Sequence, residues 1–172
     1  MSKKLLFLIV IILFCSSFLR PSPTTWNGAS ITFTKANYAD WTLAANQDRI
    51  TSNVWITRKD TQGVYNIVSE TGYSYFYSPA GTEWAYGTTA DYASLEYQDW
   101  LSWCGGNPPS FVNQDAVVHL IDDDIYIDIK FTSWSGGKSG GGFSYQRSTD
   151  QSMPVELNLF SASLINKVIQ LK

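Results

Sequence analysis

Apolar and polar residues alternate with a period of two along much of the chain, most clearly over residues 117–134. In the second half of this stretch four apolar residues fall on one face: Ile125, Ile127, Ile129 and Phe131. The other face carries Tyr126, Asp128, Lys130, Thr132 and Trp134. This period is typical of a half-buried strand, and three aspartates between two apolar runs predict the turn of a central hairpin. Asp128 and Lys130 can pair with each other or with a neighbouring strand.

Other stretches combine strand-forming residues with similar alternation and are separated by turn-forming clusters. We predict strands over residues 30–35, 49–58, 64–69, 71–77, 82–86, 93–100, 116–121, 124–134 and 143–147. A hairpin turn is expected at residues 59–63, and loops are expected at residues 36–48, 104–110 and 135–142, the last one glycine-rich and flexible. Short strands with turns between them indicate an all-β fold, an antiparallel β-sandwich or jelly-roll-like domain.

The first residues have the three-part pattern of a secretory signal peptide. Lys3 and Lys4 form a basic start, residues 5–14 are apolar, and residues 15–17 are small. The apolar segment is shorter than the roughly 20 residues that span a bilayer, so we expect residues 1–17 to be removed and the protein to be exported. Phe14 stands where lipid-modified precursors carry a small residue, which disfavours a lipid anchor on Cys15. Residues 18–28 then form an extended leader before a domain at residues 29–150.

Net charge and cysteine content exclude some classes of binding partner and some covalent links. Without the signal peptide the chain keeps 10 basic and 15 acidic residues, a net charge of −5 that argues against nucleic acid and anionic lipid surfaces. No second apolar span follows, so we expect no membrane span in the mature chain. Cys104 would then be the only cysteine, which excludes an intramolecular disulfide. We predict a buried thiol, with a bridge to another chain as the alternative.

Two resemblances extend this picture. NQDRITSNVWITR (residues 46–58), SPAGTEWAYGTTA (78–90), QDAVVHLIDDDIYIDIKFTSW (114–134) and GGGFSYQRST (140–149) are similar to a module of secreted bacterial proteins. That resemblance implies export and an autonomous domain, but no activity. PVELNLFSAS (154–163) resembles the start of the fibronectin-type-III-like domains of many type IX-secreted bacterial surface proteins. It implies that residues 151–172 are the truncated start of a second domain, with a turn at residues 165–167, in a longer extracellular or cell-surface protein.

Few residues support a catalytic function. YIDIKF (residues 126–131) resembles the E-x-D-x-E strand of laminarinase-type glycoside hydrolases, but Tyr126 and Lys130 stand where that family has its two catalytic glutamates. Retaining hydrolysis needs two carboxyl groups about 5 Å apart, and only Asp128 of the pattern remains. His119 is the only histidine and lacks a G-x-S-x-G elbow, so we expect it on a sheet face bonded to a neighbour. Neither a zinc site nor a phosphate loop at residues 136–142 is indicated, and we predict no enzymatic activity and no cofactor.

Calcium is the one metal that the sequence suggests. Asp122, Asp123 and Asp124 crowd one turn, and Asp115 and Asp128 lie nearby in the sequence. Calcium takes oxygen ligands from carboxylates and carbonyls, often in such loops. The alternative is that aspartates suit a hairpin turn because they tolerate left-handed backbone and cap free N–H groups.

Seven tryptophans are many for 172 residues, and we expect some of their rings to reach the surface. Exposed aromatic rings beside polar side chains are common in sugar-binding sites, because ring faces stack on pyranose C–H groups. We expect the binding residues in irregular segments, where function is usually found: Trp41, Trp84, Trp100 and Trp103. The alternative is that these rings cap the core. The leading hypothesis is a secreted binding or adhesion module for a polysaccharide or cell-surface glycan. A structural spacer and a glycoside hydrolase are the alternatives.

Overall fold

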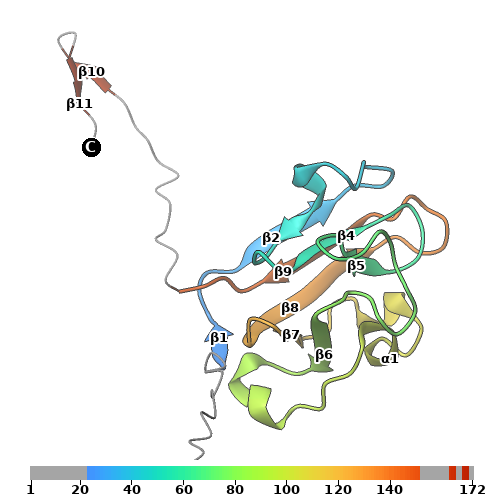
Figure 1. Cartoon of the computed structure of the whole chain (residues 1–172). Helices are drawn as coiled ribbons and strands as arrows, with labels where there is room; N and C mark the ends of the chain where they lie inside the picture. Colours follow the sequence, from blue (N-terminus) through green and yellow to red (C-terminus); the bar gives the residue numbers. More distant parts are fainter. Residues whose placement is uncertain (1–22, 152–162, 166–167, 171–172) are drawn as a thin grey trace, which may run out of the picture.

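The computed structural model describes residues 23–151, 163–165 and 168–170, so the expected signal peptide lies outside the described residues. A six-stranded sheet forms the larger part of the fold (Figure 1): β1 (Thr24–Trp26), β2 (Ile31–Lys35), β6 (Thr82–Tyr86), β7 (Ala116–Leu120), β8 (Ile125–Trp134) and β9 (Phe143–Arg147). Its order is β2–β9–β8–β7–β6 with antiparallel neighbours, and β1 pairs with β8 in parallel. A smaller antiparallel sheet contains β3 (Asp48–Arg49), β4 (Trp55–Arg58) and β5 (Val64–Asn66).

The long strand β8 lies at the centre of the larger sheet. One edge pairs with β7, and the other edge is shared end to end by β1 and β9. Ser148 joins these two strands, since its hydroxyl donates to the carbonyl oxygen of Trp26 at 2.5 Å. Part of the segment expected to be a leader is therefore a strand of the sheet. Main-chain pairing with β8 places this strand there. A short stretch without periodicity does not predict such pairing.

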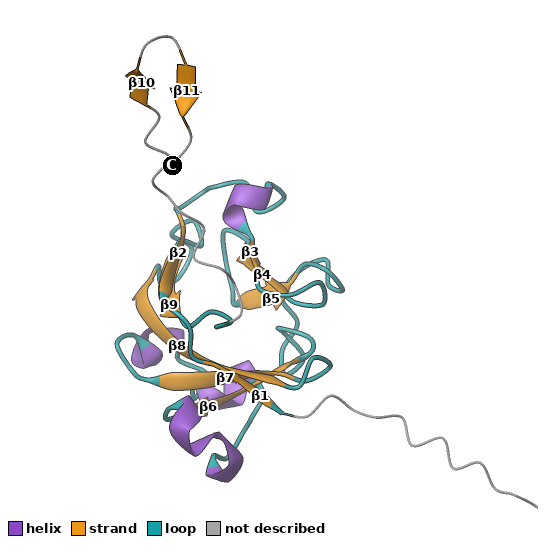
Figure 2. Ribbon diagram, turned by 90° about the vertical axis from the view of Figure 1, so that its left-hand side faces the viewer, coloured by secondary structure: helices purple, strands orange, loops and turns teal. Residues whose placement is uncertain are grey.

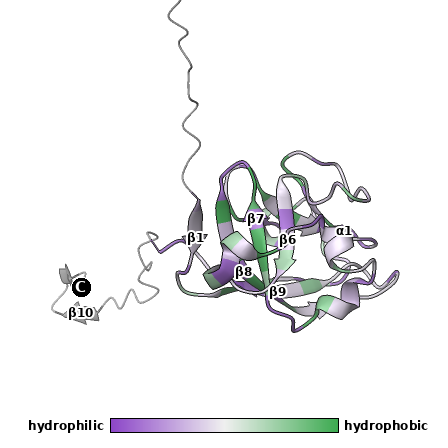
Figure 3. Cartoon of the chain, turned by 90° about the horizontal axis from the view of Figure 1, so that it is seen from below, coloured by the Kyte–Doolittle hydropathy of each residue, from purple (hydrophilic) through white to green (hydrophobic). Residues whose placement is uncertain are grey.

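The smaller sheet faces the larger one (Figure 2). Side chains from both sheets fill the space between them. Ile56 and Val64 come from the smaller sheet, Ile127 and Phe131 from β8, and Tyr145 from β9, and each is at most 1% exposed. Hydrophobic and hydrophilic positions alternate along β8, whereas β7 begins with three hydrophobic residues (Figure 3). The predicted all-β, antiparallel sandwich is confirmed, and the described strands form no closed barrel.

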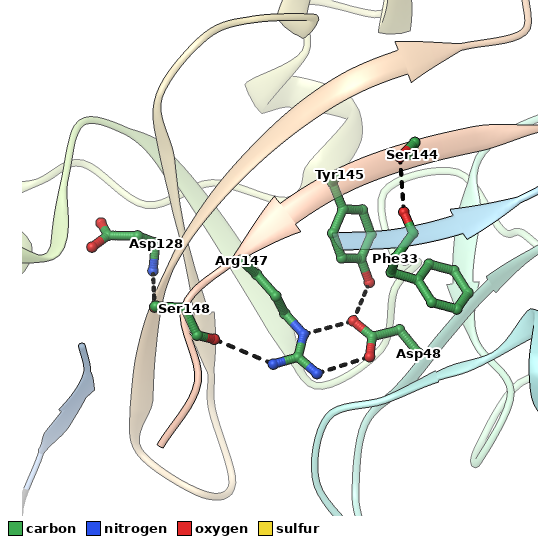
Figure 4. Close-up of polar contacts among 7 residues, drawn as sticks. All are labelled: Phe33, Asp48, Asp128, Ser144, Tyr145, Arg147 and Ser148. Carbon is green, nitrogen blue, oxygen red and sulfur yellow. Dashed lines mark hydrogen bonds and ion pairs between the residues drawn. The ribbon is translucent and has the colours of Figure 1, made fainter. Parts of the chain in front are cut away.

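A buried polar network joins the two sheets (Figure 4). Arg147 of β9 donates from Nε and Nη2 to the carboxylate of Asp48 in β3, at 2.6 and 2.8 Å. The Tyr145 hydroxyl donates to the same carboxylate at 2.6 Å. Because the buried carboxylate and guanidinium are paired and hydrogen-bonded, the network holds the two sheets together without leaving an uncompensated charge.

Some predicted strands are wrong because local capping outweighs the pattern. The strand expected over residues 93–100 is replaced by a 3-10 helix (Thr89–Ser94) and by α1 (Trp100–Trp103), which Asp99 caps by accepting from the Ser102 backbone N–H at 3.0 Å. Residues 71–77 form turns, and the strand expected over residues 49–58 is interrupted at residues 50–54. Two further 3-10 helices, Ala44–Asn46 and Pro108–Phe111, lie in expected loops.

Near the C-terminus, β10 (Ser163–Ile165) and β11 (Val168–Gln170) pair as an antiparallel hairpin, as expected. Residues 154–162, which carry most of the fibronectin-type-III resemblance, lie outside the described residues. The identity of a second domain therefore stays a prediction.

Candidate functional site

Three of the four tryptophans expected to bind a ligand are buried. Trp84, Trp100 and Trp103 are 0%, 1% and 4% exposed, so the expectation that these rings reach the surface is wrong. Trp100 and Trp103 are three residues apart on α1 and therefore turn into the core together. Trp41 is half-buried in the loop before β3, where the Lys59 ammonium lies 5.4 Å from its ring centroid.

A cavity of about 360 Å³ opens where the β4–β5 hairpin, the loop after β5, α1 and the loop after β8 meet. We call this cavity the aromatic pocket. Aromatic rings, two amide side chains and one guanidinium line it, together with glycines and prolines. Such a mixture of apolar surface and a few polar groups is typical of small-ligand sites. The side chains with a ring, amide or charge are Arg58, Gln62, Tyr73, Tyr75, Trp100, Asn107 and Trp134.

A β-bulge brings Trp134 to this pocket. Phe131 pairs with Tyr145 and Ser133 pairs with Ser144, so β8 contains one extra residue between them. Strict alternation would place Trp134 on the face opposite Phe131, as the sequence pattern predicted. The bulge instead turns it to the same face as Phe131, with the two ring centroids 6.0 Å apart. Bulges commonly redirect side chains beside functional sites.

The loop between β5 and β6 projects three consecutive aromatic residues beside the pocket. Tyr75, Phe76 and Tyr77 are 59%, 63% and 77% exposed. Phe76 has a φ of 63°, a left-handed conformation that costs a non-glycine residue about 1 kcal/mol. Exposed rings on a strained backbone are a recurrent feature of binding loops.

Glu70 fixes the base of this aromatic loop. Its carboxylate accepts hydrogen bonds from the backbone N–H groups of Asn66 and Ala80, at 2.7 and 2.8 Å, and from the Ser78 hydroxyl. The Ser78 oxygen in turn accepts from the Ser74 backbone N–H at 2.7 Å. Both ends of the loop are thus tied to one carboxylate, and the exposed rings are held in place without being buried.

Tyr73 connects this loop to α1. Its ring lies edge-on to Trp100, with centroids 5.8 Å apart, and to Tyr75 at 5.3 Å. Gly63 permits this approach, since a Cβ there would lie 2.7 Å from the Trp100 ring. Within the described residues, neither the buried hydroxyl of Tyr73 nor the buried indole N–H of Trp100 has a hydrogen-bond partner. Burial raises the pKa of Tyr73 to about 12.

The glycine-rich loop after β8 forms another wall. Gly136 and Gly137 line the pocket, but the second half of the loop is packed rather than flexible, contrary to the expectation. The Gly142 N–H donates to the Asn37 side chain at 2.9 Å. Gly141 has a φ of 65°, and a Cβ there would overlap the carbonyl oxygen of Lys59. Only glycine fits so close to another backbone segment.

Arg58 is the one charged side chain that lines the aromatic pocket. It is 2% exposed, and its guanidinium carbon lies 3.6 Å from the centroid of the Trp134 ring. Nε donates to the carbonyl oxygen of Gln62 at 2.7 Å and Nη1 to that of Gly142 at 3.2 Å. Burial lowers its pKa to about 10, so the side chain stays positively charged at neutral pH.

A second cavity, of about 400 Å³, lies over the larger sheet. Its charged side chains are engaged with neighbouring segments. Lys130 pairs with Asp115 at 2.7 Å, and Asp128 accepts from the backbone N–H and hydroxyl of Thr89, both at 2.7 Å. Asp128 and Lys130 therefore do not pair with each other, and their partners Thr89 and Asp115 lie beside strands rather than in them. These contacts explain the cavity as a structural junction better than as a site of chemistry.

The aspartate turn directs its carboxylates to different protein partners. Asp123 accepts from the Thr51 hydroxyl at 2.6 Å and from the Asn53 amide at 2.7 Å, while Asp124 contacts His119 at 3.2 Å. Asp124 also has a φ of 51°, the left-handed backbone expected of a turn aspartate. In the described part of the chain no three His, Cys, Asp or Glu side chains form a group that could hold a metal. Calcium binding by Asp122, Asp123 and Asp124 stays a prediction.

The predictions for the single histidine and for Cys104 are confirmed. His119 is 8% exposed on a sheet face, with Nδ1 2.8 Å from a Glu83 carboxylate oxygen and its ring stacked on Tyr126 at 4.0 Å. Cys104 is 2% exposed at the end of α1, and burial raises the pKa of its thiol.

The comparisons with known proteins add no constraint: no family model, curated protein or solved structure matches the chain. None of the described helices is long and apolar enough to cross a bilayer. Of the residues expected to bind a ligand, only Trp100 lines the aromatic pocket, while Arg58, Tyr73, Tyr75 and Trp134 were missed. The aromatic run at residues 73–77 was the signal that could have located it.

Proposed function

We propose that the protein is an exported, non-catalytic binding or adhesion module that recognises a glycan at the aromatic pocket. The observation that carries the proposal is the exposed ring of Tyr75 at the edge of an aromatic-walled cavity that also presents the Gln62 and Asn107 amides. A pyranose ring can stack its C–H face on Tyr75 while its hydroxyls bond to the amides.

Preorganisation supports this function. The Glu70 carboxylate holds the aromatic loop, and hydrogen bonds to the Asn37 side chain and the Tyr38 main chain fix the far half of the glycine-rich loop. A site whose walls are already ordered loses little conformational entropy when it binds a ligand. Export, which the signal-peptide pattern suggests, would place such a module where polysaccharides and cell-surface glycans occur.

The test is a binding assay of the full chain against a panel of neutral and acidic polysaccharides, by affinity electrophoresis and tryptophan fluorescence. Tyr75→Ala should weaken binding about fivefold, as expected for loss of one aromatic contact of about 1 kcal/mol. Tyr77→Ala is the matched control, because Tyr77 lies in the same loop and is more exposed but does not line the pocket. Equal effects of the two variants, or no binding across the panel, would contradict the proposal.

A structural spacer is the second candidate function. The buried Asp48–Arg147 network is a feature that such a domain would also have. The exposed run of rings at Tyr75, Phe76 and Tyr77 favours the binding function, since a spacer gains nothing from apolar surface held in water.

A further inference from the structure

We infer that the sugar bound in the aromatic pocket carries an anionic group, a carboxylate or a sulfate ester, and that Arg58 is the residue that selects it. This inference rests on the proposed glycan-binding function. It goes further by naming the ligand class and the specificity-determining residue.

The positive charge of Arg58 is buried, with no acidic partner in the part of the chain that the structure describes. Among the described residues the ion pairs involve other side chains, so no carboxylate neutralises this buried guanidinium. Its polar partners are the carbonyl oxygens of Gln62 and Gly142, and Nη2 takes part in none of the hydrogen bonds within the described part of the chain. A buried cation held only by carbonyl dipoles and a ring is compensated less well than one paired with an anion.

Arg147 is a buried arginine of the same fold whose positive charge is paired with a carboxylate. Arg147 is also buried, but the Asp48 carboxylate binds two of its nitrogens, at 2.6 and 2.8 Å. Arg58 lies against the aromatic pocket and not against an acidic residue of β3. Only an anion that enters the pocket can therefore take the place that Asp48 has beside Arg147. The planar guanidinium fork suits carboxylate and sulfate oxygens, and Trp134 fixes its plane.

The other charged side chains near Arg58 also favour an anionic ligand. Lys35 is a second buried cation, and Arg58 contributes to the lowering of its pKa, after burial and against the opposing effect of Asp60. Asp60 and Asp40 raise the pKa of Lys35, whereas no carboxylate of the described residues contributes to the pKa of Arg58. No acidic side chain lines the aromatic pocket, and the acidic neighbour of Tyr73, Asp99, is engaged as the cap of α1.

The experiment compares ligands that differ only in charge, with the full chain at about 0.1 M salt. Polygalacturonate is measured against highly methyl-esterified pectin, and dextran sulfate against dextran. We expect one acidic polymer to bind about tenfold or more tightly than its neutral partner, and the pair that shows it tells a carboxylate from a sulfate ligand. The chain has a net charge of −3, which disfavours non-specific adsorption to polyanions.

Matched variants then assign the effect to Arg58. Arg58→Gln should remove the preference, whereas Arg49→Gln should keep it, although both remove one guanidinium that lies over a tryptophan. If Arg58→Gln does not fold, Gln62→Glu serves instead, because Gln62 is exposed at the pocket and a carboxylate there repels an anion. Gln114→Glu, exposed outside the pocket, is its control.

The outcomes separate the two proposals. Neutral polymers that bind as well as acidic ones, or a preference that survives both Arg58→Gln and Gln62→Glu, would overturn the role of Arg58 but leave glycan binding in place. No binding of any polymer would overturn the glycan-binding function itself.

Discussion

At the scale of single residues, the buried charges explain much of how this domain is held together. Arg147 joins β9 to β3 through Asp48, whereas Lys130 and Asp115 form a similar pair at the surface, with side chains 40% and 64% exposed. The same attraction has different consequences in the two places. Removing one partner in the interior leaves an unsolvated charge, but at the surface water replaces it.

This contrast gives a matched pair of substitutions. Asp48→Asn should lower the free energy of unfolding by about 3–5 kcal/mol, because Arg147 would remain buried without its anion. Asp115→Asn should change it by less than about 1 kcal/mol. Urea titration followed by tryptophan fluorescence measures both variants. Similar losses in the two would show that the buried network does not hold the sheets together.

Gly141 and Gly137 offer a second matched pair, within one loop. Both have positive φ, at 65° and 57°, but a Cβ on Gly141 would overlap the Lys59 carbonyl oxygen while one on Gly137 meets nothing within 4 Å. Gly137→Ala should cost only the left-handed strain of about 1 kcal/mol. Gly141→Ala should cost about 3 kcal/mol or more, because backbone must move. Thermal unfolding tells them apart, and equal melting temperatures would mean that the loop is not packed as described.

At the scale of elements, hydrogen bonds to neighbouring side chains hold two of the three aspartates in the turn between β7 and β8. Thr51, Asn53 and His119 are bonded to Asp123 and Asp124, so two of the three clustered carboxylates already have protein partners. We therefore expect the melting temperature to be the same in EDTA and in millimolar calcium. A calcium-dependent rise that Asp122→Asn abolishes would instead establish an ion at this turn.

The β-bulge in β8 is the other element that decides the site. With one extra residue between Phe131 and Ser133, Trp134 turns into the aromatic cluster and forms a wall of the pocket, where Arg58 covers one face of its ring. A regular strand would have placed the same tryptophan on the opposite face. The single extra residue in β8 thus places Trp134 in the wall of the candidate site.

At the scale of the whole molecule, buried tyrosines predict how stability depends on pH. Burial raises the pKa of Tyr65 and Tyr73 to about 12, and burial and Asp48 raise that of Tyr145 well above its ordinary value. A tyrosine whose pKa is higher in the folded state stabilises fully below the unfolded value of about 10. That stabilisation is lost as the pH rises toward the folded value.

We therefore expect the free energy of unfolding to fall between about pH 10 and pH 12. Arg58 acts in the opposite direction there, because burial lowers its pKa to about 10, but it is one group against several tyrosines. Urea midpoints across this range measure the effect, and tyrosinate absorbance reports ionisation. Full ionisation of every tyrosine near pH 10 without unfolding would contradict the burial of these rings.

Local pattern alone determined the parts of the fold that depend on side-chain alternation. The central hairpin, the β4–β5 hairpin, β2, β6 and β9 were all predicted, because a strand with one buried face must alternate. The sheet position of His119 followed from the same argument, whereas the buried Cys104 thiol was predicted from the cysteine count. Alternation fails where a cap or a carboxylate organises the chain instead, as Asp99 does at α1 and Glu70 does in the aromatic loop.

Only the tertiary structure decided the candidate site. The sequence singled out the tryptophans as candidate binding residues, but which rings are buried depends on α1 and on contacts between distant segments. The pocket gathers Arg58, Tyr73, Trp100 and Trp134 from four parts of the chain, and no spacing in the sequence relates them. A strand pattern specifies which face is buried, whereas a binding site requires knowing which segments meet, and packing of the complete sandwich sets that.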